Sequence, residues 1–230
     1  MENKQTNKPA FQPIILIPVY NGRDSLYTLN KQIASITDLP VIVVNDGSTD
    51  GLMENDLQGV IYLKHDENRG KGAALKTGLQ RAKSLGYTHC ITLDADGQHD
   101  PQFLPKFINL QKSYPDRLVV GARDLSDPSM PFHRKLSNNI TSLMVSLRIG
   151  APVLDAQVGY RSYPLKDSRL WESIEDGFQF ESDVFFKVSK LNYKLAWQPV
   201  SVIYNGASSN MEPVWDTLRF VRTYFRSFMC

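Results

Sequence analysis

The sequence contains little cysteine, little net charge and no long apolar run. Cys90 and Cys230 are its two cysteines among 230 residues, too few for a disulfide framework or a zinc site, so a reducing compartment is expected. The formal charge of +2 gives no global reason to bind nucleic acid. No stretch approaches the roughly 18 apolar residues of a spanning helix, and the polar first eight residues do not resemble a signal peptide. These absences predict a cytoplasmic protein that is soluble or lies on a membrane without crossing it.

Short apolar runs alternate with helical spacing over the first half of the chain. The runs, typical of strands buried on both faces, lie at 14–17, 41–44, 60–63, 90–93 and 118–120. Helical spacing of apolar residues lies between them, at 26–36, 72–86 and 103–110. This alternation predicts an α/β fold with a mostly parallel sheet and helices on both faces. In such a sheet, ligands bind beyond the carboxyl ends of the strands.

The second half of the chain is less regular. Apolar residues spaced by three and four predict a helix over 133–149, and similar spacing predicts another over 184–191. Residues 155–163 look extended, 193–204 alternate like a strand, and 213–229 look helical. We therefore divide the chain into a loose tail at 1–12, one domain at 13–212 and an amphipathic helix at 213–230.

Polar residues follow three of the predicted strands. Asp46 follows the second, Asp94 and Asp96 follow the fourth, and Arg123 follows the fifth. Residues i and i+2 of a strand face the same side, roughly 6.6 Å apart, so Asp94 and Asp96 would repel each other. A bound Mg²⁺ or Mn²⁺, with phosphate oxygens and water as further ligands, would relieve that repulsion. The alternative is that each aspartate only caps or closes a turn.

A glycine-containing loop opens the helix predicted after residue 72. In Asn68-Arg69-Gly70-Lys71-Gly72, Lys71 and the helix start favour an anion. The loop is not a Walker motif, because His65 occupies the first glycine position and Gly72 the Ser/Thr position. Nor is it a dinucleotide fingerprint, because Leu75 replaces the last glycine. The four histidines show no metal-ligand spacing and are expected to be solvated or structural.

Taken together, four motifs resemble one known family. These are Pro-Val-Tyr-Asn at 18–21, Val-Asn-Asp-Gly-Ser-Thr-Asp at 44–50, the loop at 68–72 and Leu-Asp-Ala-Asp-Gly-Gln at 93–98. Their order and spacing resemble glycosyltransferase family 2, which implies the GT-A fold. Further matches at 121–123, 155–161 and 180–183 are similar to the branch of polyprenyl- or dolichyl-phosphate mannose or glucose synthases. The resemblance covers about residues 13 to 220.

The resemblance implies a role for each matched position. Pro18, Tyr20 and Asp46 would hold the nucleoside of a GDP- or UDP-hexose, and Asp94 its ribose region. Asp96 would bind the Mg²⁺ or Mn²⁺ that bridges the diphosphate, with Gln98 nearby. Arg123 and Arg134 would bind the phosphate of the acceptor. The sugar and acceptor side would be lined by Asp155, Gln157, Glu181 and Asp183. The sequence departs from the family at Gly22, where many members carry Glu, and in lacking a membrane span after residue 204.

The implied reaction is metal-dependent, inverting transfer of a hexose to a polyprenyl phosphate at the cytoplasmic face of a membrane. A phosphate acceptor is already ionised near neutral pH, since its second pKa is about 6, and needs no general base. If the acceptor is a hydroxyl of a polysaccharide or lipid, a carboxylate must take its proton: Asp183 first, Glu181 second. The alternative for both is capping of the following helix. A nucleotidyltransferase and a non-catalytic nucleotide-sugar binder remain further alternatives.

The predicted C-terminal helix has the pattern of a helix that lies at a membrane surface. Arg219, Arg222 and Arg226 lie along one edge, beside a broad aromatic face. The alternative is that this apolar face packs on the domain and the arginines are solvated. The helix over 133–149 would be its companion, with Arg134 and Arg148 near its ends.

Overall fold

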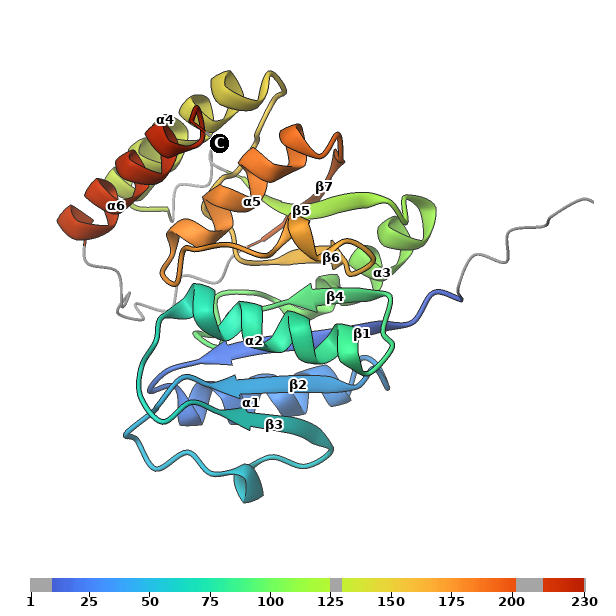
Figure 1. The fold of residues 1–230 in the computed structure, drawn as a ribbon. Helices are drawn as coiled ribbons and strands as arrows, with labels where there is room; N and C mark the ends of the chain where they lie inside the picture. Colours follow the sequence, from blue (N-terminus) through green and yellow to red (C-terminus); the bar gives the residue numbers. More distant parts are fainter. Residues whose placement is uncertain (1–9, 125–129, 202–212, 230) are drawn as a thin grey trace, which may run out of the picture.

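A computed structural model describes residues 10–124, 130–201 and 213–229. Its centre is one seven-stranded sheet in the order β3-β2-β1-β4-β6-β5-β7 (Figure 1). The strands are β1 (Pro13–Val19), β2 (Val41–Asn45), β3 (Val60–Lys64), β4 (His89–Thr92), β5 (Arg117–Arg123), β6 (Arg161–Pro164) and β7 (Lys194–Val200). The helices are α1 (Arg23–Ala34), α2 (Lys71–Ser84), α3 (Leu104–Ser113), α4 (Phe132–Ile149), α5 (Gln179–Lys190) and α6 (Pro213–Arg226). Three short 3₁₀ turns are η1 (Glu54–Asp56), η2 (Pro101–Phe103) and η3 (Ser168–Leu170).

The sheet is mostly parallel, as predicted. β1 pairs in parallel with β2 and β4, β2 with β3, and β5 with β7. β6 runs antiparallel to both of its neighbours, β4 and β5. The extended segment predicted at 155–163 is therefore a strand only from Arg161 on. Residues 1–9 of the predicted tail, and the end of the strand predicted at 193–204, lie outside the described residues.

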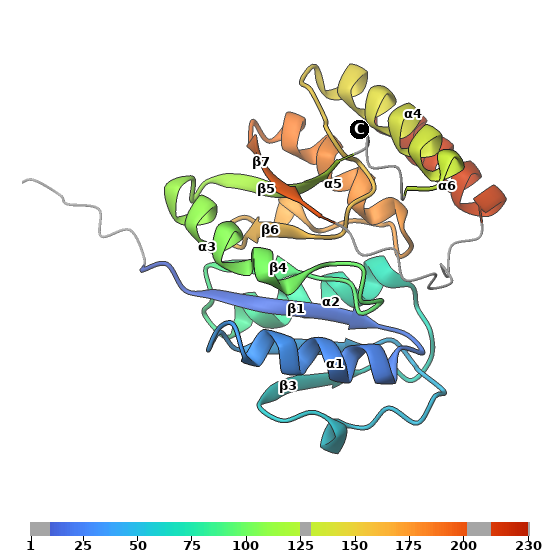
Figure 2. The same cartoon turned by 180° about the vertical axis from the view of Figure 1, so that it is seen from behind.

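Helices cover both faces of the sheet. α2 and α5 lie on the face seen in Figure 1, and α1 and α3 lie on the face seen in Figure 2. Every residue of β1 and β2 is buried, because both strands are central and covered on both sides. α2 approaches β1 closely enough that a Cβ at Gly78 would overlap the Leu16 side chain. The core thus holds the carboxyl ends of β1, β2 and β4 in fixed positions at one edge.

α4 confirms the helix predicted over 133–149, but its apolar row faces outward. Five large apolar side chains on it are about half exposed or more: Phe132, Leu136, Ile140, Leu143 and Leu147. The buried side holds Asn138 and Ser142 beside Val145. The Ser142 hydroxyl accepts a hydrogen bond from the Ala156 N–H at 3.0 Å. The helix is therefore held on the domain largely by polar contacts and presents its apolar face to solvent.

α6 packs on α5 and lies beside α4 (Figures 1 and 2). Its Thr223 hydroxyl donates to Glu175 at 2.8 Å, and Arg226 pairs with Glu175 at 2.7 Å. Trp215, Leu218, Phe225 and Phe228 remain more than half exposed. The helix thus docks through a polar edge together with Phe220 and Tyr224, and leaves much of its apolar face open. No helix in the described parts of the chain is long and apolar enough to cross a membrane.

Candidate functional site

Asp46 at the end of β2 organises the loop that leads into α2. Its buried carboxylate accepts hydrogen bonds from the backbone N–H of Arg69 at 3.0 Å and of Gly70 at 2.7 Å. The His65 ring lies 2.6 Å from the same carboxylate and 3.0 Å from the Thr77 hydroxyl. Gly70 has a φ of +99°, a conformation that suits glycine. The predicted nucleoside residue therefore also fixes the start of α2, which carries Lys71.

Lys71 lies between two acidic side chains. Its Nζ is 2.7 Å from Asp94 Oδ1 and 3.0 Å from Glu181 Oε1, and the three side chains are 15%, 22% and 7% exposed. Burial opposes the charge on Lys71, but the two carboxylates outweigh it and raise the pKa of Lys71. Burial likewise opposes ionisation of Asp94, but Lys71, with His99 and Arg161, lowers the pKa of Asp94. We call Lys71, Asp94 and Glu181 the triad; its formal charge is −1.

The pair Asp94 and Asp96 does not have the strand geometry that the sequence suggested. β4 ends at Thr92, and residues 95 and 96 form a turn, so the spacing of a strand does not apply. Asp94 points to Lys71, whereas Asp96 is exposed. The charge that relieves Asp94 is the lysine, which makes that part of the argument for a metal wrong. The two aspartates have separate surroundings.

Asp96 fits a divalent ion that is shared with a ligand. One of its oxygens accepts the Gln98 N–H at 2.9 Å, and its side chain is open to solvent. No group of three or more His, Cys, Asp or Glu side chains in the described ranges is arranged so that it could hold a metal ion. Mg²⁺ is commonly held by one or two carboxylates plus substrate phosphates. The residues present therefore suit an ion that arrives with a diphosphate, with Asp96 as its protein ligand and the Gln98 side chain nearby.

Glu181 and Asp183 lie on different sides of α5. Glu181 joins the triad, but Asp183 accepts a hydrogen bond from Ser173 at 2.6 Å and pairs with Lys187 at 3.3 Å. Arg226 of α6 lies 3.9 Å from the second Asp183 oxygen. The structure thus brings Glu181 to the triad and holds Asp183 against the segment that follows η3 and against α6. Asp183 was the first candidate for a general base, and its contacts here do not bring it to the triad.

Arg123 and Asp155 form a buried two-point ion pair. Arg123 Nε lies 2.6 Å from Asp155 Oδ2, and Nη2 lies 2.9 Å from Oδ1. Asp155 is fully buried. The next residue but one, Gln157, donates to the hydroxyls of Ser137 at 3.1 Å and Thr141 at 3.2 Å on α4. The end of β5, the loop before β6 and α4 are therefore linked, and Arg134 lies half-buried in the first turn of the same helix.

The loops after β1 and β2 are tied together. Pro18 is buried within β1 beside Val44, and Tyr20 is half-buried just beyond the strand. The Asn21 N–H donates to Ser48 Oγ at 2.9 Å, and the Asn21 side chain accepts the Thr49 N–H at 2.8 Å. The structure therefore places the predicted nucleoside residues at neighbouring strand ends, as the motif order implied.

Three buried residues near the site were not predicted to have a role. His65 contacts Asp46, and His99 accepts the Asp94 N–H at 3.0 Å through its ring. Arg161 is fully buried and contributes to the low pKa of Asp94. Their places along the chain could have suggested a role, because His65 directly follows β3 and His99 lies five residues after Asp94. Histidine spacing alone could not reveal them, since each is paired with one aspartate and not with another histidine.

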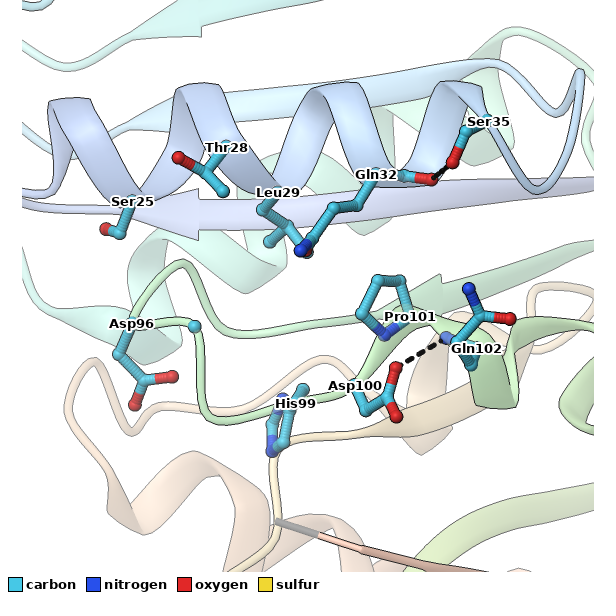
Figure 3. A pocket seen from close by; sticks show the side chains of 11 residues that line it. Ser25, Thr28, Leu29, Gln32, Ser35, Asp96, His99, Asp100, Pro101 and Gln102 are labelled. Atoms are coloured by element: carbon cyan, nitrogen blue, oxygen red, sulfur yellow. Dashed lines mark hydrogen bonds between the residues drawn. The ribbon is translucent and has the colours of Figure 1, made fainter. Parts of the chain in front are cut away.

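A cavity of about 390 Å³ lies between α1 and the turn after Asp96 (Figure 3). Its polar lining is largely occupied by local contacts. The Thr28 hydroxyl donates to Asp24 O at 3.0 Å, the Ser35 hydroxyl to Gln32 O at 2.7 Å, and Asp100 accepts the Gln102 N–H at 2.9 Å. Of the predicted site residues only Asp96 lines it. We therefore place the functional site at the strand ends and not in this cavity.

Comparisons with known proteins agree on one family. A sequence model of the family described as "Glycosyl transferase family 2" matches residues 14–179. An undecaprenyl-phosphate mannosyltransferase of Micrococcus luteus is 28% identical over 203 residues, 83% of each chain. A UDP-N-acetylglucosamine–dolichyl-phosphate N-acetylglucosaminyltransferase of Methanococcus voltae is 28% identical over 218 residues, 83% of this chain and 85% of the relative.

The fold comparison points the same way. The glucosyl-3-phosphoglycerate synthase of Mycobacterium tuberculosis, solved with Mn²⁺, UDP and glucosyl-3-phosphoglycerate, superimposes with a TM-score of 0.67 at 15% identity. The match covers 96% of this chain and 79% of that one. At this identity the likeness shows the fold, which is the GT-A fold expected from the motifs.

Proposed function

Because the chain belongs to glycosyl transferase family 2, we propose that it transfers a hexose from a nucleotide-diphosphate sugar to the phosphate of a polyprenyl lipid. The family decides for hexosyl transfer over the nucleotidyltransferase and non-catalytic alternatives. The proposal adds three finer statements: a divalent ion assists, the acceptor is a lipid phosphate, and the protein lies on a membrane.

The donor half of the proposal rests on the strand ends of β1, β2 and β4. Tyr20 and Asp46 would flank the nucleoside, and Lys71 stands at the start of α2, where the helix dipole favours an anion. Asp96 and the nearby Gln98 would hold Mg²⁺ or Mn²⁺ against the diphosphate. Such an ion, when bound, neutralises charge on the departing nucleoside diphosphate. Lys71 adds a fixed positive charge on the same side, held in place by Asp94 and Glu181.

The acceptor half of the proposal rests on one observation about α4: its apolar face points outward and its polar face points toward the domain. Its outward face carries five exposed apolar side chains, while its inward face carries Asn138, Ser142 and the hydroxyls that contact Gln157. A water-soluble acceptor would need the polar face but not the apolar one. A lipid phosphate needs both, a polar place for the head group and an apolar surface for the membrane around it. Arg123 and Arg134 would supply the cationic contacts to that phosphate.

The carboxylates near the site also favour a phosphate acceptor. Glu181 is paired with Lys71, Asp155 with Arg123, and Asp183 with Lys187. Each candidate general base for a hydroxyl acceptor is thus already engaged by a cation. A phosphate monoester is ionised near neutral pH and attacks without proton removal, since its second pKa is about 6. The hydroxyl-acceptor alternative would require one of these ion pairs to open.

Transfer assays with defined acceptors test the proposal. Purified protein with Mn²⁺ or Mg²⁺ is supplied with GDP-mannose, UDP-glucose or UDP-N-acetylglucosamine, and with a polyprenyl phosphate, the matching polyprenol or 3-phosphoglycerate. We expect one donor to release its nucleoside diphosphate and to give an acid-labile glycosyl phospholipid with the polyprenyl phosphate only. Transfer to the polyprenol or to 3-phosphoglycerate, with none to the phosphate, would contradict the lipid-phosphate acceptor and favour a hydroxyl acceptor.

Vesicle binding tests the membrane statement without any catalysis. Leu143 and Leu147 are 61% and 73% exposed on α4, and burying a leucine contributes about 1.5–3 kcal/mol. Replacing both with Ser should lower partition onto anionic vesicles by roughly a hundredfold, since about 3 kcal/mol is lost. The control replaces Tyr27 and Leu85, which are 47% and 41% exposed elsewhere on the surface, with Ser. Equal partition of the two double variants would refute membrane contact through α4.

A further inference from the structure

Arg161 is a fully buried cation that neither the donor nor the acceptor contacts proposed above require. It is among the largest side chains with no exposed surface. Arginine is rarely buried completely unless it is paired with an acid, because removing the charge from water is costly. No carboxylate of a described residue lies within ion-pair distance of its guanidinium. A buried charge of this kind adds little to stability compared with an apolar side chain of similar size. Its retention therefore needs another explanation.

The Arg161 guanidinium donates hydrogen bonds to three backbone carbonyls and also contacts one aromatic ring. Its Nε donates to Val158 O at 2.9 Å, Nη2 to Ala156 O at 3.1 Å and Nη1 to Glu181 O at 2.7 Å. The guanidinium also lies 4.6 Å from the centre of the Phe185 ring. Three donors of a rigid planar group thus bind two different segments, the loop before β6 and the first turn of α5.

These two segments carry residues of both parts of the site. We call Lys71, Asp94 and Glu181 the donor half, and Arg123 and Asp155 the acceptor half. The Glu181 residue whose carbonyl is bound places its carboxylate in the triad beside Lys71. The loop at 156–158 directly follows Asp155, which holds Arg123. The loop also passes Gly159, where a Cβ would come within 2.5 Å of Asp94 Oδ2. Thr92 gives the same loop a second attachment, since its hydroxyl donates to Gly159 O at 2.7 Å.

We infer that Arg161, assisted by Thr92, is a positioning residue that sets the distance between the donor half and the acceptor half of the site. It binds no substrate itself. Its guanidinium fixes the segment that carries Asp155 against the helix turn that carries Glu181. The inference rests on the hexosyl-transfer part of the proposed function, and not on the choice of acceptor.

Replacing Arg161 should uncouple two events, the breaking of the donor's C–O bond and the attack of the acceptor. In transfer, an acceptor oxygen bonds to the anomeric carbon and the nucleoside diphosphate leaves with the electron pair of the broken C–O bond. In hydrolysis, water takes the place of the acceptor and gives its proton to the solvent. If the two halves drift apart, the donor still binds and reacts with water, but the acceptor is misplaced. A displacement of about 1 Å is enough to cost about a hundredfold in rate.

The experiment measures donor binding, transfer and donor hydrolysis in the same preparations. Arg161→Lys keeps the positive charge but loses the planar group that donates to three carbonyls. Thr92→Val loses only the hydrogen bond from the Thr92 hydroxyl to the Gly159 carbonyl. Ile33→Ala is the control: it empties core volume under α1, remote from both segments, and lowers stability through a cavity. Thermal unfolding midpoints establish which variants fold and allow comparison at matched stability.

We expect Arg161→Lys to bind the donor within about threefold of wild type and to lose about a hundredfold in transfer kcat, the scale for such a displacement. Its ratio of hydrolysis to transfer should rise by at least about tenfold, with a smaller rise in Thr92→Val, while Ile33→Ala keeps the wild-type ratio. An unchanged ratio in the folded variants overturns the inference. If Arg161→Lys does not fold, the ratio in Thr92→Val decides. A wild-type protein that transfers no hexose would instead refute the proposed function.

Discussion

Removing the positive charge of the triad tests the electrostatic reasoning directly. The carboxylates of Asp94 and Glu181 lie 2.7 and 3.0 Å from the Lys71 amine, and in Lys71→Met they lose this cation and meet an apolar side chain instead. Breaking a buried ion pair by removing one partner costs about 3–5 kcal/mol. Asp94 is 22% exposed, so the lower end applies, and we expect a loss of about 3 kcal/mol in the free energy of unfolding at pH 7.5.

The loss should depend on pH in a defined direction. In the wild type, the pKa of Asp94 is lowered, so its contribution to stability is present above the unfolded pKa of about 3.9 and is lost as the pH falls. In Lys71→Met, burial remains and the main charge that lowers the pKa of Asp94 is gone, so that pKa rises. The variant then gains stability relative to wild type as the pH falls. Between pH 7.5 and pH 5, the difference in the free energy of unfolding between the two proteins should therefore become smaller.

Urea unfolding at pH 7.5 and pH 5 is the assay, with Lys76→Met as the matched control. Lys76 lies one helical turn further along α2 and pairs at 2.7 Å with Asp176, which is 59% exposed, so its loss should cost no more than about 1 kcal/mol at either pH. Adding Glu181→Gln to Lys71→Met should restore part of the stability. The reasoning is refuted if Lys71→Met loses no more than Lys76→Met at pH 7.5, or if its loss is the same at pH 5.

Three further predictions follow from the same geometry. Asp96→Ala should abolish the Mn²⁺-dependent part of nucleotide-sugar binding in calorimetry. It should leave the melting temperature unchanged, because the side chain is exposed. Metal-dependent binding at wild-type strength would contradict the role of Asp96 as a metal ligand. Gly159→Ala would place a methyl group 2.5 Å from Asp94 and 2.8 Å from Lys71, so these side chains must shift and donor affinity in calorimetry should fall. Burial lowers the pKa of His89, so the stability of the wild type should decline as the pH falls below about 6.5, the pKa of the unfolded state. His89→Gln should remove this contribution to the decline, as measured by thermal melts at pH 7.5 and 5.5.

The fold could be predicted wherever burial was uniform. β1 and β2 are covered on both faces, so their residues are continuous apolar runs that the sequence displays. β6 was partly missed, because its sequence Arg-Ser-Tyr-Pro has no such run. It is buried nonetheless, since the Arg161 guanidinium donates to the nearby carbonyls of Ala156 and Val158 and also to that of Glu181, 20 residues further along the chain. Local pattern cannot reveal a burial that depends on partners distant in the chain.

The site could be predicted in its positions but not in its pairings. The positions of the predicted strands placed Asp46, Asp94 and Arg123 at the carboxyl ends of β2, β4 and β5, where the structure has them, and ligands bind at such ends. These positions could not show that Asp94 is paired with Lys71. Nor did they separate Glu181 from Asp183. Once α5 begins at Gln179, these two residues lie two apart on one helix and face different sides, so only one can reach the triad.

α4 shows why apolar spacing alone does not decide what a helix faces. Leu136, Ile140, Leu143 and Leu147 define one face whether that face meets a core or a membrane. The direction is set by the opposite face, because the backbone N–H groups of Val153 and Ala156 require acceptors, which Ser146 supplies at 2.8 Å and Ser142 at 3.0 Å. Small polar residues that recur every fourth position opposite an apolar row therefore indicate a helix whose polar side meets the protein. By that reasoning the apolar side of α4 is free for a lipid surface, and the Leu143 and Leu147 variants test it.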